Sequence, residues 1–81
     1  MPTAFVFITT EPANMSFVLN NVRSIDGVTE AEMVYGVFDI VAKVQTETMD
    51  QLKQIITFKI RRIANVLKTD TLLVVLPGPV K

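Results

Sequence analysis

Apolar residues change their spacing repeatedly along this chain, and the order of the changes leaves few possible folds. Four segments have the short, β-branched and aromatic composition of strands: residues 3–10, 28–35, 37–44 and 69–76. Residues 11–25 carry apolar side chains at helical spacing, and a second helical pattern begins at Met49. The order β-α-β-β-α-β predicts an α+β fold, a ferredoxin-like βαββαβ sandwich with two helices on one face of an antiparallel sheet. We expect one domain over residues 1–76 and a loose tail over 77–81, because "PGPVK" cannot continue a strand.

Both helices have start signals in the sequence. Pro12 suits a first helical turn, and either Thr10 or Asn14 can cap that helix. Thr48 and Gln51 fit a capping box at the start of the second helix. We expect the second helix to turn these apolar side chains inward: Met49, Leu52, Ile55, Ile56, Ile60 and Ile63.

A short internal repeat supports this arrangement. The sequences "RSIDGV" (23–28) and "RRIANV" (61–66) share the pattern R-x-I-x-[GN]-V, 38 residues apart, where a helix gives way to a strand. Gly27 and Asn65 are the residue types that best tolerate the left-handed conformation after a helix. The chain therefore looks like two βαβ-like halves related by pseudo-symmetry.

The sheet face opposite the helices is predicted to be apolar. Residues 3–10 and 37–44 should be central in the sheet, with 69–76 beside 3–10. In the first strand apolar side chains occupy both alternating sets, Ala4, Val6 and Ile8 on one side and Phe5 and Phe7 on the other, and the last strand has the same character. A chain of 81 residues supplies no third layer, and a large exposed apolar patch usually marks an interface. We therefore expect a two-fold dimer through this face, a dimeric α+β barrel.

Composition argues against several classes of function. Lys plus Arg and Asp plus Glu both total eight, so no charge excess indicates a nucleic-acid partner. The chain has no histidine or cysteine and lacks the common phosphate-binding, nucleophile and zinc motifs, so we expect no enzyme, no metal and no cofactor. No apolar run approaches the ~20 residues of a membrane span, and "MPTAFVF" lacks signal-peptide features. We expect a cytoplasmic protein without membrane contact.

Asp39 is the residue that the strand pattern explains least. Strands disfavour aspartate, and a carboxylate removed from water without partners is costly. Counting by two, Asp39 shares the bare sheet face with Val41 and Lys43, close to the turn at Gly36. A structural alternative is that Asp39 accepts hydrogen bonds from turn amides or pairs with Lys43 or an arginine, while Gly36 only makes the turn.

Three other residues have both a functional and an ordinary interpretation, and two arginines have only an ordinary one. Tyr35, Thr69 and Thr71 can supply further hydrogen bonds, although each is also an ordinary strand residue. Arg61 and Arg62 are expected to be solvated, as charge clusters usually are.

The stretch "VYGVFDIVAKV", the R-x-I-x-G-V ahead of it and the closing "TDTLLVV" resemble the RAM domain. This is the C-terminal effector-binding module of the Lrp/AsnC family of amino-acid-responsive transcription regulators. Tyr35, Gly36, Phe38 and Asp39 occupy the family pattern of a small or aromatic residue, glycine, any residue, an aromatic residue and aspartate. The family's usual N-terminal helix-turn-helix domain has no counterpart, so the resemblance is to the stand-alone type and implies no DNA contact of its own.

The resemblance also implies a function. In the family two sheets pack face to face, dimers assemble into octameric or similar rings, and a free amino acid binds between subunits near the glycine–aspartate turn. The resemblance implies that Asp39 accepts a hydrogen bond from the ligand ammonium, or that it holds the loop that binds the ammonium. It also implies that Gly36 exposes its backbone to the ligand. Tyr35, Thr69 and Thr71 complete the expected site. The implied partners are a free amino acid, further copies of the chain and full-length Lrp/AsnC regulators.

Three alternatives to this function stay open. The dimeric α+β barrel also hosts monooxygenases and isomerases, so an enzyme on this scaffold is one alternative. A purely structural oligomerisation module that binds no ligand is another. An ACT-type domain is a further amino-acid-binding βαββαβ module, although the Gly-x-Phe-Asp stretch fits the RAM domain better.

Overall fold

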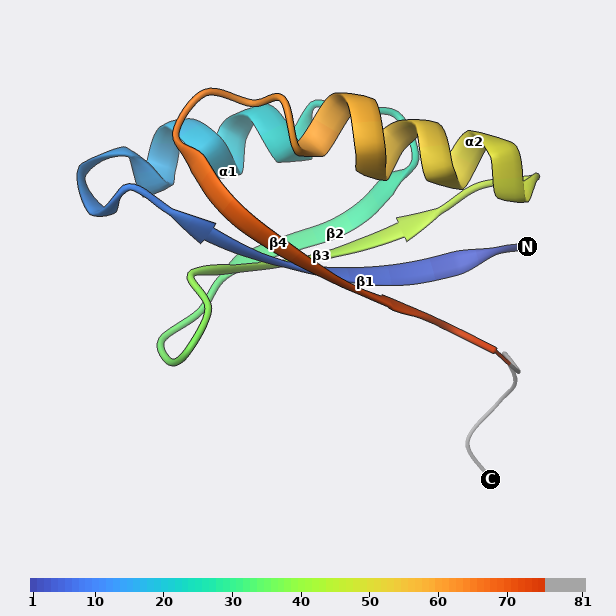
Figure 1. Cartoon of the computed structure of the whole chain (residues 1–81), viewed down its shortest axis with the longest axis horizontal. Coiled ribbons are helices and arrows are strands. Elements are labelled where there is room, and N and C mark those ends of the chain that lie inside the picture. Colours follow the sequence, from blue (N-terminus) through green and yellow to red (C-terminus); the bar gives the residue numbers. More distant parts are fainter. Residues whose placement is uncertain (76–81) are drawn as a thin grey trace.

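A computed structural model describes residues 1–75 and shows the predicted element order (Figure 1). β1 (Thr3–Thr10) leads through a 3-10 turn (Pro12–Asn14) into α1 (Met15–Arg23), and β2 (Val28–Met33) and β3 (Ile40–Gln45) follow. α2 (Met49–Gln54) continues as a π-helical segment (Ile55–Ile60) before β4 (Val66–Leu73). The α+β, ferredoxin-like class is confirmed. Leu76 and the predicted tail over 77–81 lie outside the described residues.

The sheet has four antiparallel strands in the order β2-β3-β1-β4, and both helices lie on one side of it (Figure 1). This order and the one-sided helix layer are those expected from right-handed crossovers. β1 and β3 are central, with Val6 opposite Ala42 and Ile8 opposite Ile40. The edges of the sheet are β2 and β4.

The core fills the space between the sheet and the helices. One alternating set of side chains on the central strands is fully buried: Ala4, Val6 and Ile8 on β1, and Ile40, Ala42 and Val44 on β3. The helices pack onto this set with Val18, Leu19 and Val22 from α1 and with Leu52, Ile55 and Ile60 from the second helix. Burial of branched aliphatic side chains on both layers supplies most of the favourable free energy of folding.

The ends of three strands differ from the predicted bounds, and β2 ends at Met33 rather than at residue 35. β3 begins at Ile40 rather than at residue 37, because Ile8–Ile40 is the last pair that β1 makes with it. Beyond Ile8, β1 pairs only with β4, with a register shift at Thr9 and Thr10. Residues 35–38 therefore have no neighbouring strand to pair with. β4 starts at Val66 and ends at Leu73, three residues earlier at each end than predicted.

The helix start signals are confirmed in part. Thr48 Oγ1 accepts from the Gln51 amide at 3.2 Å and Gln51 Oε1 accepts from the Thr48 amide at 3.2 Å, which is the predicted capping box. Asn14 is the N-cap residue of α1, but its side chain makes no capping hydrogen bond. The inward prediction for Met49 was wrong, since this first residue of α2 is 38% exposed.

The internal repeat has a repeated structure. Gly27 has a φ of 101° and Asn65 a φ of 74°, the positive values predicted for both. The hydrogen bonds around them repeat as well: the Ile25 amide donates to Val22 and Val28 to Ile25, as Ile63 donates to Ile60 and Val66 to Ile63. The two halves therefore leave their helices by the same turn, as pseudo-symmetry predicts.

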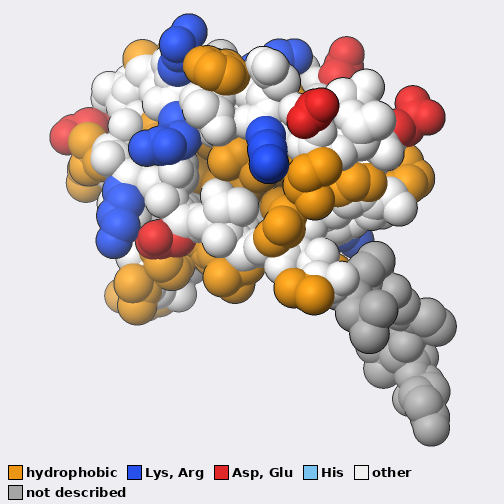
Figure 2. Space-filling model, turned by 45° about the vertical axis from the view of Figure 1, so that its right-hand side comes forward, with side chains coloured by type: hydrophobic (Ala, Val, Ile, Leu, Met, Phe, Trp, Pro, Cys, Tyr) orange, Lys and Arg blue, Asp and Glu red, His pale blue; other side chains and the backbone are white. Residues whose placement is uncertain are grey.

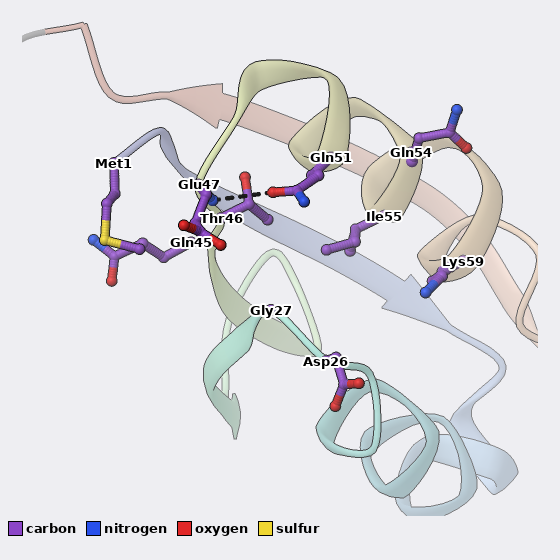
Figure 3. Close-up of a pocket in the computed structure, with 10 residues that line it drawn as sticks. All are labelled: Met1, Asp26, Gly27, Gln45, Thr46, Glu47, Gln51, Gln54, Ile55 and Lys59. Carbon is purple, nitrogen blue, oxygen red and sulfur yellow. Dashed lines mark hydrogen bonds between the residues drawn. The ribbon is translucent and has the colours of Figure 1, made fainter.

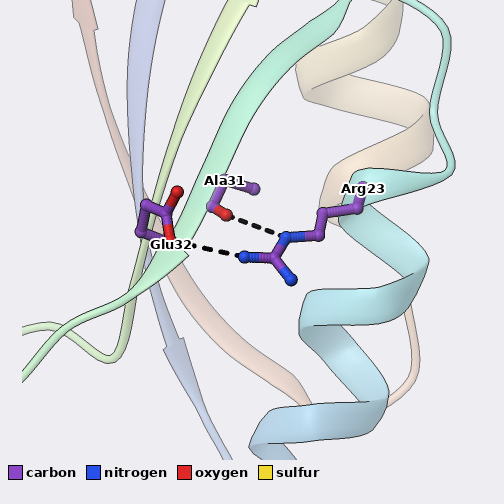
Figure 4. Close-up of polar contacts among 3 residues, drawn as sticks. All are labelled: Arg23, Ala31 and Glu32. Atoms are coloured by element: carbon purple, nitrogen blue, oxygen red, sulfur yellow. Dashed lines mark hydrogen bonds and ion pairs between the residues drawn. The ribbon is translucent and has the colours of Figure 1, made fainter.

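Arg23, the first residue of the repeat, ties α1 to the edge strand β2 (Figure 4). Its Nε donates to the carbonyl oxygen of Ala31 at 2.9 Å, and its Nη2 lies 3.3 Å from Glu32 Oε1. The arginines of the second repeat are exposed, as expected, and the Arg62 guanidinium lies 4.9 Å from the centre of the Phe58 ring.

The sheet face without helices carries the other alternating set of side chains. Hydrophobic side chains reach the surface along the lower, sheet side of the molecule (Figure 2). Phe5 and Phe7 are half-buried there, and Leu72, opposite Phe5, is 59% exposed. We call this set on β1–β4 the bare face; its charged members are Glu30, Glu32, Lys43, Lys68 and Asp70. Its apolar stripe, which includes Phe5 and Phe7, is bordered by charges on both edge strands and by Lys43 on β3.

Candidate functional site

The carboxylate of Asp39 has a partner inside the subunit. Its Oδ2 accepts a hydrogen bond from the Thr10 amide at 2.8 Å, across 29 residues of sequence. The backbone of Asp39 is also held, because its amide donates to Ile8 at 3.0 Å and its carbonyl accepts from Val34 at 2.8 Å. Among residues 1–75 the ion pairs are formed elsewhere, so Asp39 pairs with neither Lys43 nor an arginine. Asp39 thus fastens the end of the β2–β3 loop to the end of β1.

The loop between β2 and β3 stands out from the body of the sheet. Tyr35 and Val37 on this loop are almost fully exposed. Gly36 lacks a positive φ, and a Cβ built on it would meet nothing within 4 Å. The turn of a single subunit therefore does not require glycine at this position.

The remaining two predicted residues lie on the other face of the sheet. Thr69 is opposite Ile8 and Thr71 is opposite Val6, so both share the side that faces the helices. Asp39 directly precedes β3 and is two positions before Val41, so it lies on the side of the bare face. One subunit thus brings Asp39 near Gly36 and Tyr35, but it does not bring the threonines into the same site.

A shallow hollow of about 300 Å³ opens on the bare face between β1, β2 and β3. Its apolar walls are Phe5, Val34 and Val41, and its charged margin is Glu30, Glu32 and Lys43. Val34 is also the first residue of the β2–β3 loop, so the hollow borders the predicted site. The bare face therefore combines apolar surface with both signs of charge in this hollow.

A second hollow, of about 420 Å³, was missed by sequence reasoning (Figure 3). It lies between the α1–β2 turn, the β3–α2 connection and the second helix, and its lining includes Asp26, Glu47, Ile55 and Lys59. The sequence offered only a helix stop at "DG" and a helix start at "TETMDQ" as signals. Three segments far apart in sequence form the hollow, so only the packed structure reveals it.

Neither a cluster of metal ligands nor a membrane-spanning helix is found in the described part of the chain. Residues 1–75 contain no group of three or more His, Cys, Asp or Glu side chains placed to hold a metal ion. None of the helices formed by these residues has the length and apolar character needed to cross a bilayer.

Residues 3–76 match the model of the Lrp/AsnC ligand binding domain. TTHA0845 from Thermus thermophilus is 29% identical with a TM-score of 0.91, and the match covers 98% of this chain and 99% of that one. The hypothetical protein PHS023 from Pyrococcus horikoshii is 35% identical with a TM-score of 0.87, covering 95% of this chain and 93% of that one. No protein of curated function matches the chain.

Longer regulators share the fold. AsnC from E. coli is 27% identical with a TM-score of 0.88, and the match covers 99% of this chain but 54% of AsnC. The transcriptional regulator NMB0573 from Neisseria meningitidis, solved as a complex with L-Met, is 15% identical with a TM-score of 0.76. That match covers 93% of this chain and 50% of the regulator, and at this identity it shows the fold alone.

Proposed function

Because the chain belongs to the Lrp/AsnC ligand-binding domain family, we propose that it is an amino-acid-sensing regulatory module of the cytoplasm. The module assembles at least as a dimer and binds a free amino acid between subunits. Through mixed assembly it would modulate full-length Lrp/AsnC regulators. The observation that carries the proposal is the match of nearly the whole chain to the ligand-binding part of these regulators.

The bare face supports the proposed dimer. It exposes an apolar stripe that includes Phe5, Phe7 and Leu72, and a domain of 81 residues gains much from extra burial. Packing the bare faces of two copies about a two-fold axis would remove this stripe from water. The face carries both signs of charge, Glu30 and Glu32 on β2, Lys43 on β3, and Lys68 and Asp70 on β4, and opposite charges on two copies can pair across the interface.

Gly36 supports a binding site beside this interface. Neither its backbone conformation nor its surroundings within one subunit require glycine. A glycine in such a place is explained by the close approach of a ligand or another chain to the backbone. The nearby Asp39 carboxylate can accept a second hydrogen bond besides that from Thr10, because a carboxylate has about four acceptor positions. A free amino acid supplies an ammonium for that carboxylate and a carboxylate for exposed amides.

A thermal-shift screen of the twenty amino acids tests the proposal. We expect at least one amino acid at about a hundred times its Kd to raise the melting temperature by about 10–20 °C, because binding to the folded state alone stabilises it. The D-enantiomer of the stabilising amino acid is the control, and it should have a smaller effect. If all twenty leave the melting temperature unchanged, the chain is not an amino-acid sensor.

Paired substitutions separate the two roles of Asp39. Asp39→Asn keeps an oxygen that accepts from Thr10 but loses the charge, whereas Asp39→Ala loses both. If Asp39 receives the ligand ammonium, both variants should weaken binding about tenfold or more, and only Asp39→Ala should lower the free energy of unfolding, by about 1–3 kcal/mol. Calorimetry with the amino acid from the screen and urea unfolding measure the two effects. An Asp39→Asn variant with wild-type affinity would leave Asp39 with its structural role alone.

A further inference from the structure

We propose that the hollow between the α1–β2 turn and the second helix binds a free amino acid within a single subunit. This site is separate from the loop that carries Gly36 and Asp39. The inference takes only the class of ligand, a free amino acid, from the proposed function. It assigns the position, the charged residues and the preferred side chain from the structure of the hollow itself.

Charges of both signs, all on exposed residues, border the hollow. Lys59 reaches from the second helix towards the turn that carries Asp26, and Glu47 lies on the connection between β3 and α2 (Figure 3). Among residues 1–75 none of these three side chains forms an ion pair. We assign the carboxylate of a bound zwitterion to Lys59 and its ammonium to Asp26.

The base of the hollow is apolar and closely packed. Ile55 is only 6% exposed, and a Cβ on Gly27 would come within 2.5 Å of its Cδ1. The side chain of Met1 adds apolar surface at one margin (Figure 3). The volume of about 420 Å³ lies in the range of small-molecule sites and exceeds what an amino acid needs. An apolar amino acid can therefore place its side chain on Ile55 while its charged groups face the rim.

The amide side chains of two lining glutamines already have partners. Gln51 Oε1 accepts from the amides of Glu47 and Thr48, both at 3.2 Å, and Gln45 Nε2 lies 3.3 Å from Thr3 Oγ1. These contacts fix the wall formed by the β3–α2 connection. The side chains of Asp26, Glu47 and Lys59 do not take part in these contacts.

The pseudo-symmetry of the fold provides an internal comparison. In the other half, the residue 38 positions before Lys59 is Asn21, and the residue 38 positions after Asp26 is Ala64. Asn21 turns its Nδ2 to the carbonyl of Phe17 at 2.8 Å. The half of the fold that carries Asn21 and Ala64 thus forms without charges at these two positions. The charges of Asp26 and Lys59 are therefore not required by the fold.

The test combines protein variants with altered ligands. L-Methionine is titrated into 15N-labelled protein, and Kd is taken from the amide shifts of Gly27 and Thr46. Lys59→Met and Asp26→Asn should each raise Kd about fivefold. Lys59→Met should leave the Kd of L-methioninol unchanged, because that ligand has no carboxylate, and Asp26→Asn should likewise not affect N-acetyl-L-methionine. Lys53→Met is the matched control, since Lys53 is exposed on α2 and outside the lining of the hollow.

The outcomes distinguish this site from the one between subunits. Shifts at Gly27 and Thr46 that persist in Asp39→Asn and weaken in Lys59→Met establish the site. Shifts confined to Gly36 and Ile40 overturn the inference and leave the proposed function standing. The absence of any shift with L-methionine also overturns it, while the proposed function is decided by the screen of all twenty amino acids.

Discussion

Replacement of Phe5 by glutamate should convert the assembled protein into monomers. Phe5 lies on the central strand β1 and on the bare face, so a two-fold interface there would contain it twice. The change removes two aromatic side chains from the interface and introduces two charges, which should raise the dissociation constant at least about a thousandfold. Sedimentation velocity at micromolar concentration should show a dimer or larger species for the wild type and a monomer for the variant.

The neighbours of Phe5 make it a better choice than Phe7 for this test. Phe5 is opposite Lys43, which can pair with the new glutamate within one subunit, whereas Phe7 is opposite Asp70. Phe17→Glu is the matched control, because Phe17 is 49% exposed on α1 and away from the bare face. A wild type that sediments as a monomer, or a Phe5→Glu variant that assembles normally, would refute the proposed interface.

Gly27→Ala should destabilise the fold by about 2–3 kcal/mol. The φ of 101° is strained for any residue with a Cβ, and the added methyl group would press on the buried Ile55. For a domain of this size the loss corresponds to roughly 10–20 °C in melting temperature. Thermal unfolding should be compared at equal protein concentration, because self-association contributes to stability.

Gly36→Ala is the matched control for Gly27→Ala. It adds the same methyl group in space that is open within one subunit, at a position without positive φ, so the stability of the unassembled subunit should change by less than about 0.5 kcal/mol. Equal stability losses in the two variants would contradict the different roles assigned to the two glycines.

The sequence predicts the fold well because its signals are local. Strand composition, helical spacing and the capping residues Thr48 and Gln51 act within a few positions, and the repeat around Gly27 and Asn65 marks both helix-to-strand turns. The strand bounds were less predictable, since the start of β3 depends on how far β1 runs beside it. Val37 and Phe38 have the composition of strand residues, but no strand lies next to them.

The candidate site was predictable in part only, because it depends on contacts between distant segments. The pattern singled out Asp39, but its bond to the Thr10 amide follows from the packing of β1 against the β2–β3 loop. Thr69 and Thr71 fell on the opposite face because the register of β4 on β1 is set by tertiary pairing. The hollow around Ile55 combines three segments, and the motifs in them, the repeat at 23–28 and the capping box at Gln51, specify turns and helix ends rather than a ligand site.

The two edges of the sheet are not equivalent, and this limits how copies of the chain can polymerise. Arg23 occupies the carbonyl of Ala31, so an incoming strand that pairs along β2 would first have to displace a charged hydrogen bond. Two copies that joined through their β4 edges would leave a β2 edge at each outer end. Edge-to-edge growth would then stop at two copies, because a fibre needs an edge strand that can pair on both sides of every subunit. Arg23 thus favours closed oligomers with a fixed number of subunits over open-ended aggregation.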